Sequence, residues 1–135
     1  MAEKLIRVAA QREIINTEKL SITDDYDKFS NDFPFQLTDD QDSAIKDVIS
    51  DLEAGKLMDR LICGDVGFGK TEVALRASFI VANAGYQVAL VAPTTILVKQ
   101  HYKCFYERFK NSSLNVSSFS RMTIASNRKI IKINL

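Results

Sequence analysis

The chain has 135 residues, of which 46% are hydrophobic and 26% are charged, which fits one ordinary globular domain and excludes a disordered or low-complexity protein. The net charge of +1 conceals an asymmetry, because the acidic residues end at Glu107 and residues 108–135 carry only basic ones. This basic end could contact the phosphates of a nucleic acid, or could be a solvated or unstructured tail.

The cysteine and histidine content argues against a metal site made of these residues. Cys63 and Cys104 lie far apart, and His101 is the sole histidine, so no metal-ligand spacing can be assembled. We expect both thiols to be buried in a reducing cytosol. No stretch approaches the ~20 apolar residues of a membrane span, and the amino terminus has no apolar signal core. The sequence therefore predicts a cytoplasmic protein without a membrane partner.

The first part of the chain is predicted to be a helical lead-in followed by a connector. Apolar residues near helical spacing predict a short amphipathic helix over residues 3–15. Residues 16–36 are polar and acidic, which is typical of a connector, so the folded core should begin near Phe33.

A second helix is well signalled after this connector. Thr38 is followed three residues later by Gln41, which is a capping-box pattern. Apolar residues then recur at helical spacing until Gly55, where the helix should end.

The middle of the chain alternates between short apolar runs and helix-forming segments. The expected elements are a strand over 61–63, a helix over 70–84, a strand over 88–92, a helix from a Thr94 or Thr95 cap to Phe109, and a third strand that could span 114–119. This strand–helix alternation predicts a parallel sheet.

Residues 64–71 fit the phosphate-loop pattern of Gly, four residues and Gly-Lys-Ser/Thr. The loop consists of Gly64, Asp65, Val66, Gly67, Phe68, Gly69, Lys70 and Thr71. Its glycines let backbone N–H groups point inward, and the positive end of the following helix dipole favours an anion. Lys70 would reach the β and γ oxygens of a triphosphate, and the Thr71 hydroxyl would ligate Mg²⁺. A chance match is disfavoured, because the motif follows an apolar run and opens a helix.

The fold class that follows is α/β, with part of a P-loop (RecA-like) parallel sheet flanked by helices and preceded by a short helical segment. Adenine is the favoured base, since the amide of Gln41 can pair with both N6 and N7 of adenine. Two alternatives stay open at this point. Gln41 could serve only as the capping-box residue, and Phe35 could be a core aromatic rather than a residue that stacks on the base.

The segments FPFQLTDDQ (33–41) and MDRLICGDVGFGKTEVALR (58–76) closely resemble the bacterial transcription-repair coupling factor family. APTTILVKQHY (92–102) is similar to the next motif of that family, and Ser120-Arg121 to the step after it. The resemblance runs from about residue 1 to residue 121. By this resemblance, residues 1–32 are a helical lead-in and acidic linker, residues 33–120 are the first half of a helicase-type ATP-binding lobe, and residues 121–135 are a divergent tail.

The resemblance implies a superfamily 2 motor that uses ATP and Mg²⁺ to move along duplex DNA, displaces a stalled RNA polymerase and helps to recruit excision-repair proteins. It implies that Phe35 and Gln41 bind the adenine base, and that the phosphate loop binds the phosphates and magnesium. The residues it places at the DNA backbone are Pro93, Thr94, Thr95, Ser120 and Arg121. Without the resemblance, residues 93–95 could equally be a plain strand-to-helix turn with a threonine cap.

A hydrolysing motor also needs an acidic motif on a later strand and an arginine from a second lobe. No acidic residue follows Glu107, so we expect that this chain alone does not hydrolyse ATP. It resembles a truncated product or a split gene whose remainder a downstream chain could supply. The alternatives are a fragment of a branch-migration fork helicase, which usually has a small polar residue where Phe68 stands, a non-functional remnant, and a small kinase or GTPase.

Overall fold

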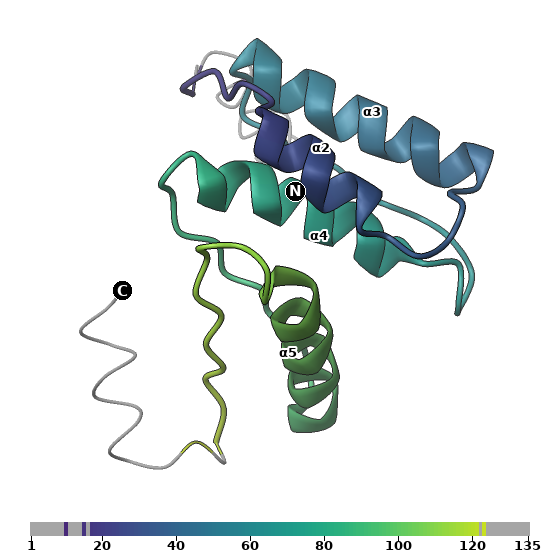
Figure 1. The fold of residues 1–135 in the computed structure, drawn as a ribbon, viewed down its shortest axis with the longest axis vertical. Coiled ribbons are helices and arrows are strands. Elements are labelled where there is room, and N and C mark those ends of the chain that lie inside the picture. Colours follow the sequence, from purple (N-terminus) through teal and green to yellow (C-terminus); the bar gives the residue numbers. More distant parts are fainter. Residues whose placement is uncertain (1–9, 11–14, 16, 122, 124–135) are drawn as a thin grey trace. The chain divides into compact units, whose positions relative to one another are not determined.

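The computed structural model describes residues 10, 15, 17–121 and 123. Its helices are α2 (Asp24–Asn31), α3 (Asp39–Ala54), α4 (Lys70–Asn83) and α5 (Thr95–Phe109) (Figure 1). The chain divides into two compact units, residues 1–84 and residues 85–135, so that α2, α3 and α4 belong to the first unit and α5 to the second. The helix expected over residues 3–15 lies almost wholly outside the described residues, as does the tail over residues 121–135.

Local signals set both ends of α3, as the sequence predicted. The Thr38 hydroxyl accepts a hydrogen bond from the Gln41 backbone N–H at 3.3 Å, and the Gln41 side-chain oxygen accepts one from the Thr38 N–H at 2.9 Å. These reciprocal bonds form a capping box and satisfy two of the N–H groups at the helix start. At the other end, Gly55 adopts a left-handed conformation with φ of 66°, which a residue with a side chain adopts only under strain.

We predict that Thr38→Ala lowers the free energy of unfolding by about 1 kcal/mol, because alanine cannot accept the capping hydrogen bond. Urea denaturation followed by far-UV circular dichroism measures this change. Thr38→Ser is the matched control, since it keeps the hydroxyl and should stay within a few tenths of a kcal/mol of the parent chain. An equal loss in both variants would show that the methyl group, and not the cap, stabilises this position.

A helix stands where the sequence predicted only a connector. α2 lies within residues 16–36, so the interpretation of this polar, acidic stretch as a connector does not account for the helix. Tyr26 and Phe29, three residues apart and therefore on one face of the helix, are both buried. They pack on Phe79 of α4, with the rings of Phe29 and Phe79 stacked at 4.3 Å between centroids. The aspartates of the first turn indicated a connector in the sequence. In the structure their negative charges lie at the positive end of the helix dipole and therefore stabilise α2.

The first unit is built on α4, against which both α2 and α3 pack (Figure 1). Ile45 and Val48 of α3 meet Val73 of α4 in the hydrophobic core, and all three side chains are buried. The partly buried residues around this cluster are Leu37, Ala44, Ile49, Leu52, Met58, Ile62 and Ala77. The core therefore lies directly beside the residues that open α4.

The predicted parallel sheet is not seen in the part of the chain that the structure describes. The segments 61–63, 88–92 and 114–119 carry no strand assignment there. Leu61 is 85% exposed and Val91 is 91% exposed. Because Val91 belongs to the 88–92 run, the prediction that this run is covered on both faces is wrong for this structure. A buried parallel strand needs hydrogen-bonded neighbours and helices over both faces, and an apolar run alone supplies neither.

In the second unit, α5 begins as predicted at a threonine cap. The Thr94 hydroxyl accepts from the Leu97 N–H at 3.2 Å, so Thr94 rather than Thr95 is the capping residue. Phe105 and Phe109 are buried and meet edge to face, with 5.6 Å between ring centroids.

The expectation of two buried thiols is wrong for Cys63, which is exposed, whereas Cys104 is half-buried. Cys63 belongs to the 61–63 run, and its exposure follows from the lack of covering elements over that run. Among the described residues, no helix is both long and apolar enough to span a membrane.

Candidate nucleotide-binding site

The phosphate loop connects residue 63 to the first turn of α4. Gly67 and Gly69 have φ values of 89° and 68°, in the left-handed region that favours glycine. Gly69 is the N-cap of α4, which begins at Lys70, and its carbonyl accepts from the Glu72 N–H at 2.9 Å. The loop residues before α4 are largely exposed, with Val66 fully so. An open loop on a helix N-terminus is an arrangement that suits an anion.

The side chain of Lys70 folds back over the start of this loop. Its Nζ donates to the backbone carbonyl oxygens of Gly64 and Asp65, each at 2.6 Å. The ammonium group therefore lies within the turn where the sequence pattern predicts phosphate oxygens. Two neutral carbonyls are weaker partners for a cation than a phosphate is, so a bound phosphate can compete for this group.

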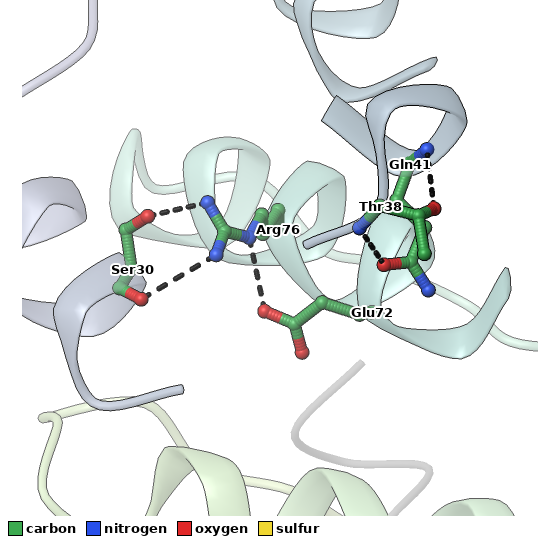
Figure 2. Close-up of polar contacts among 5 residues, drawn as sticks. All are labelled: Ser30, Thr38, Gln41, Glu72 and Arg76. Atoms are coloured by element: carbon green, nitrogen blue, oxygen red, sulfur yellow. Dashed lines mark hydrogen bonds and ion pairs between the residues drawn. The ribbon is translucent and has the colours of Figure 1, made fainter. Parts of the chain in front are cut away.

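The amide of Gln41 links the start of α3 to the phosphate loop. While its oxygen closes the capping box with Thr38 (Figure 2), its Nε2 donates to the carbonyl oxygen of Phe68 at 2.7 Å. A Cβ built on Gly69 would lie only 2.4 Å from the same nitrogen. The capping role of Gln41 is thus confirmed, and the amide also lies next to the loop. The sequence alone did not predict the contact with Phe68.

Phe35 is not a core aromatic. It is 72% exposed, and its ring meets Phe33 edge to face at 5.5 Å between centroids. Phe35 lies in the segment that leads into α3. Its ring is not packed as a core aromatic would be, and it is accessible to a planar ligand. The adenine role predicted for it remains a prediction.

An ion pair on α4 was missed by the sequence reasoning. Glu72 and Arg76 are 4% and 8% exposed at the side chain, and Arg76 Nε lies 2.9 Å from Glu72 Oε1. The remaining guanidinium nitrogens donate to the hydroxyl and carbonyl oxygens of Ser30 in α2 (Figure 2). The spacing of Glu72 and Arg76 by four residues is a signal for such a pair, but it does not reveal that both are buried.

Thr71, the predicted magnesium ligand, lies in the first turn of α4 and is half-buried. Within the described residues, no group of three or more His, Cys, Asp or Glu side chains could hold a metal ion. A magnesium ion at Thr71 would therefore depend on phosphate oxygens and water, as is usual for this ion.

The residues predicted to contact DNA lie in the second unit. Pro93 and Thr94 are exposed and Thr95 is half-buried at the start of α5. The Ser120 N–H donates to the Thr123 hydroxyl at 2.8 Å, and Arg121 is exposed. The structure brings Gln41 and the phosphate loop together in the first unit, and it leaves the DNA assignments as predictions.

The loop, its lysine and the glutamine before it define a class of protein. The family model of the DEAD/DEAH box helicases matches residues 38–134, and the chain belongs to this family. Its fold is accordingly that of a RecA-like helicase domain. The match extends beyond Arg121 into the last residues of the chain.

Individual relatives within this class are transcription-repair-coupling factors, and they confirm the resemblance drawn from the motifs. The chain is 49% identical over 140 residues to the transcription-repair-coupling factor of Rickettsia bellii (strain RML369-C), an alignment that covers 100% of this chain and 12% of that protein. The transcription-repair-coupling factor of Bacillus subtilis (strain 168) is 44% identical over 124 residues, covering 90% of this chain and 10% of that protein. The chain thus spans about a tenth of the length of these relatives.

A solved structure has a similar fold. The structure of RecG bound to a three-way DNA junction matches with a TM-score of 0.86 and 34% sequence identity, covering 96% of this chain and 18% of that chain. The fold similarity therefore includes nearly the whole chain.

Proposed function

We propose that this chain is the ATP-binding portion of a DNA-translocating, helicase-type motor that acts in transcription-coupled repair. The observation that carries the proposal is the exposed phosphate loop, in which Lys70 Nζ lies 2.6 Å from two loop carbonyl oxygens at the N-terminus of α4. In this proposal the residues of the loop, 64–71, hold the phosphates of ATP. Thr71 ligates Mg²⁺, which would neutralise charge on the bound phosphates.

The adenine base is proposed to lie against the segment 33–41. The exposed ring of Phe35 offers a face for stacking, and the Gln41 amide offers one donor and one acceptor. Because this amide already bonds to Thr38 and Phe68, binding of adenine would require Gln41 to exchange or share these partners. Binding of the base would therefore change the hydrogen bond between Gln41 and the Phe68 carbonyl oxygen of the loop.

The architecture proposed for residues 33–120 is the first half of a helicase ATP-binding lobe, with residues 1–32 as a lead-in and linker and residues 121–135 as a tail. In the assembled motor, the segments 61–63, 88–92 and 114–119 would pair as strands of a parallel sheet. Support comes from the family match and from the apolar character of these segments. Pairing would remove exposed side chains such as Leu61 and Val91 from water.

The partners proposed for the motor are duplex DNA, RNA polymerase and excision-repair proteins, which the motif resemblance to the coupling-factor family implies; the name of the relatives supports only a link between transcription and repair. Pro93, Thr94, Thr95, Ser120 and Arg121 would contact the DNA backbone. Hydrolysis would require acidic residues that this sequence does not carry after Glu107, so the chain alone binds ATP without hydrolysing it.

A branch-migration helicase is the second candidate, favoured by the similarity to RecG on a three-way DNA junction. The two candidates share the nucleotide site and differ in the DNA on which the motor acts. Stimulation of the whole motor by three-way junctions rather than by plain duplex DNA would favour the second candidate. A non-functional remnant would bind no nucleotide, whereas the proposed ATP-binding portion binds ATP without hydrolysing it.

The test is a titration of the purified chain with a fluorescent ATP analogue and Mg²⁺. Lys70→Ala should weaken binding by about tenfold to a hundredfold, which corresponds to the loss of a charge-assisted hydrogen bond. Lys99→Ala is the matched control, because it removes an exposed lysine of α5 and should leave the affinity unchanged. Phosphate release measured with and without duplex DNA should remain at background in the same samples. Equal affinities of the Lys70 variant and the parent chain would refute the proposal.

A further inference from the structure

The ion pair of Glu72 and Arg76 lies in the first unit, where it starts at the residue directly after the phosphate loop and spans about one turn of α4. Its two side chains are almost fully buried, and the nitrogen and oxygen are 2.9 Å apart. Burying an ion pair carries a desolvation cost that apolar side chains of similar size avoid, so such a pair is weak evidence for a role in stability alone. Its directional hydrogen bonds can instead hold neighbouring elements in one geometry.

Arg76 directs the rest of its donors to the end of α2. One terminal nitrogen donates to the Ser30 hydroxyl, and the other lies 3.4 Å from the Ser30 carbonyl oxygen (Figure 2). Ser30 is the residue before the last of α2, where the helix dipole favours a cation. One guanidinium group therefore connects the helix that follows the phosphate loop with the helix that precedes the segment 33–41.

The connection continues from Ser30 to the exposed ring of Phe35. The same Ser30 carbonyl accepts from the Phe33 N–H at 3.3 Å, and the Arg76 guanidinium lies 6.0 Å from the centroid of the Phe33 ring. Phe33 in turn contacts Phe35 edge to face at 5.5 Å. Arg76 thus holds Phe33 from two sides, through the backbone of Ser30 and through its ring, and Phe33 supports Phe35.

We propose that Arg76, oriented by Glu72, is a positioning residue that sets the place of the base-binding segment 33–35 relative to the phosphate loop. This inference rests on the proposed function, since it requires that Phe35 stacks on the base of ATP. Arg76 then determines the part of the affinity that comes from the base, whereas Lys70 determines the part that comes from the phosphates. Both residues belong to α4, so this helix sets the distance between the site for the base and the site for the phosphates.

The experiment compares two probes on the full 135-residue chain in the presence of Mg²⁺: ATP, and inorganic tripolyphosphate, which has no base or ribose. Isothermal titration gives the ratio of their affinities. Arg76→Gln should weaken ATP binding by about tenfold, as expected for the loss of a base–aromatic stacking contact, and should leave tripolyphosphate binding within about twofold. Arg76→Lys keeps a charge for Glu72 without the planar fork and should not restore the ratio.

Two further variants separate this role from a general effect on folding. Arg60→Gln is the control, because Arg60 is likewise an ion-paired arginine of the first unit, but its partners are Asp47 and Asp51 and not the segment 33–35. It should leave the ratio unchanged. Ser30→Ala keeps the buried ion pair and removes only the hydroxyl partner, and it should shift the ratio in the same direction as Arg76→Gln by a smaller factor. This variant tests the proposal even if Arg76→Gln does not fold.

The outcomes distinguish this inference from the proposed function. If Lys70→Ala weakens both probes and Arg76→Gln weakens only ATP, both ideas are supported. An Arg76→Gln variant that weakens both probes equally, or neither, overturns the positioning role while leaving ATP binding intact. If the parent chain binds neither probe, the proposed function fails and the positioning role fails with it.

Discussion

Replacement of Phe79 by alanine should lower the free energy of unfolding by about 3–5 kcal/mol, the largest stability effect that we expect from one substitution in the first unit. Phe79 is 3% exposed in α4, where its ring stacks on Phe29 and lies 6.5 Å from the ring of Tyr26. Deleting this ring removes apolar contacts with both aromatic residues of α2 and leaves a cavity between the helices. The attachment of α2 to α4 should therefore weaken more than the α3–α4 core does.

Urea denaturation followed by far-UV circular dichroism measures this effect, and hydrogen exchange locates it. Amide protons of α2 should lose protection first. Phe35→Ala is a matched control, because the same ring is deleted at a position that is 72% exposed, and its effect should stay within about 0.5 kcal/mol. If both variants lost the same stability, the aromatic contacts between α2 and α4 would not be what holds the first unit together.

Gly69→Ala should lower the free energy of unfolding by about 2–3 kcal/mol and should weaken ATP binding as well. The residue has φ of 68°, and a side chain in the left-handed region costs about 1–2 kcal/mol. The new Cβ would also lie 2.4 Å from Gln41 Nε2, so the amide must move and give up its bond to the Phe68 carbonyl. The loss of that bond adds about 1 kcal/mol.

Gly67→Ala separates these two contributions. Gly67 also has a positive φ, of 89°, but a Cβ there would meet no atom within 4 Å, so only the backbone strain remains. In the absence of nucleotide, Gly69→Ala should therefore be less stable than Gly67→Ala by about 1 kcal/mol. In a Gln41→Ala background, Gly69→Ala and Gly67→Ala should lower the free energy of unfolding by the same amount, because the amide that the new Cβ meets is absent. The double variant Gly69→Ala/Gln41→Ala should therefore be more stable than the sum of the two single effects predicts. Additive effects in that double variant would exclude the contact between Gln41 and the loop.

The helices that the sequence predicted correctly are those with local signals. The capping box of Thr38 and Gln41, the left-handed Gly55 and the Thr94 cap depend on residues only a few positions apart, and each is found in the structure. The phosphate loop follows the same rule, since two of its glycines adopt the positive φ values for which glycine is favoured. Hydrogen bonds and backbone sterics within one turn can be inferred from neighbouring residues alone.

Features that depend on distant residues were missed or wrong. α2 falls in a stretch that the sequence predicts to be a connector, because Tyr26 and Phe29 form a buried helix face only when Phe79 lies opposite them. The exposure of Phe35 and Cys63 could not be derived from their apolar or thiol character, and the exposed 88–92 run lacks the neighbours that would make it a buried strand. Burial is a property of what surrounds a residue, which the pattern along the chain does not specify.

By itself, the sequence determined the ends of α3, the start of α5 and the glycine turns of residues 64–71, because these rest on short-range hydrogen bonds and on the conformational freedom of glycine. Only the tertiary structure decided that α2 packs on α4 and that the Gln41 amide bonds to Phe68. It also decided that Arg76 joins Ser30 to Glu72. Apart from the pair of Glu72 and Arg76 within α4, these contacts join residues tens of positions apart, and they form only when packing of the apolar faces has brought the helices together.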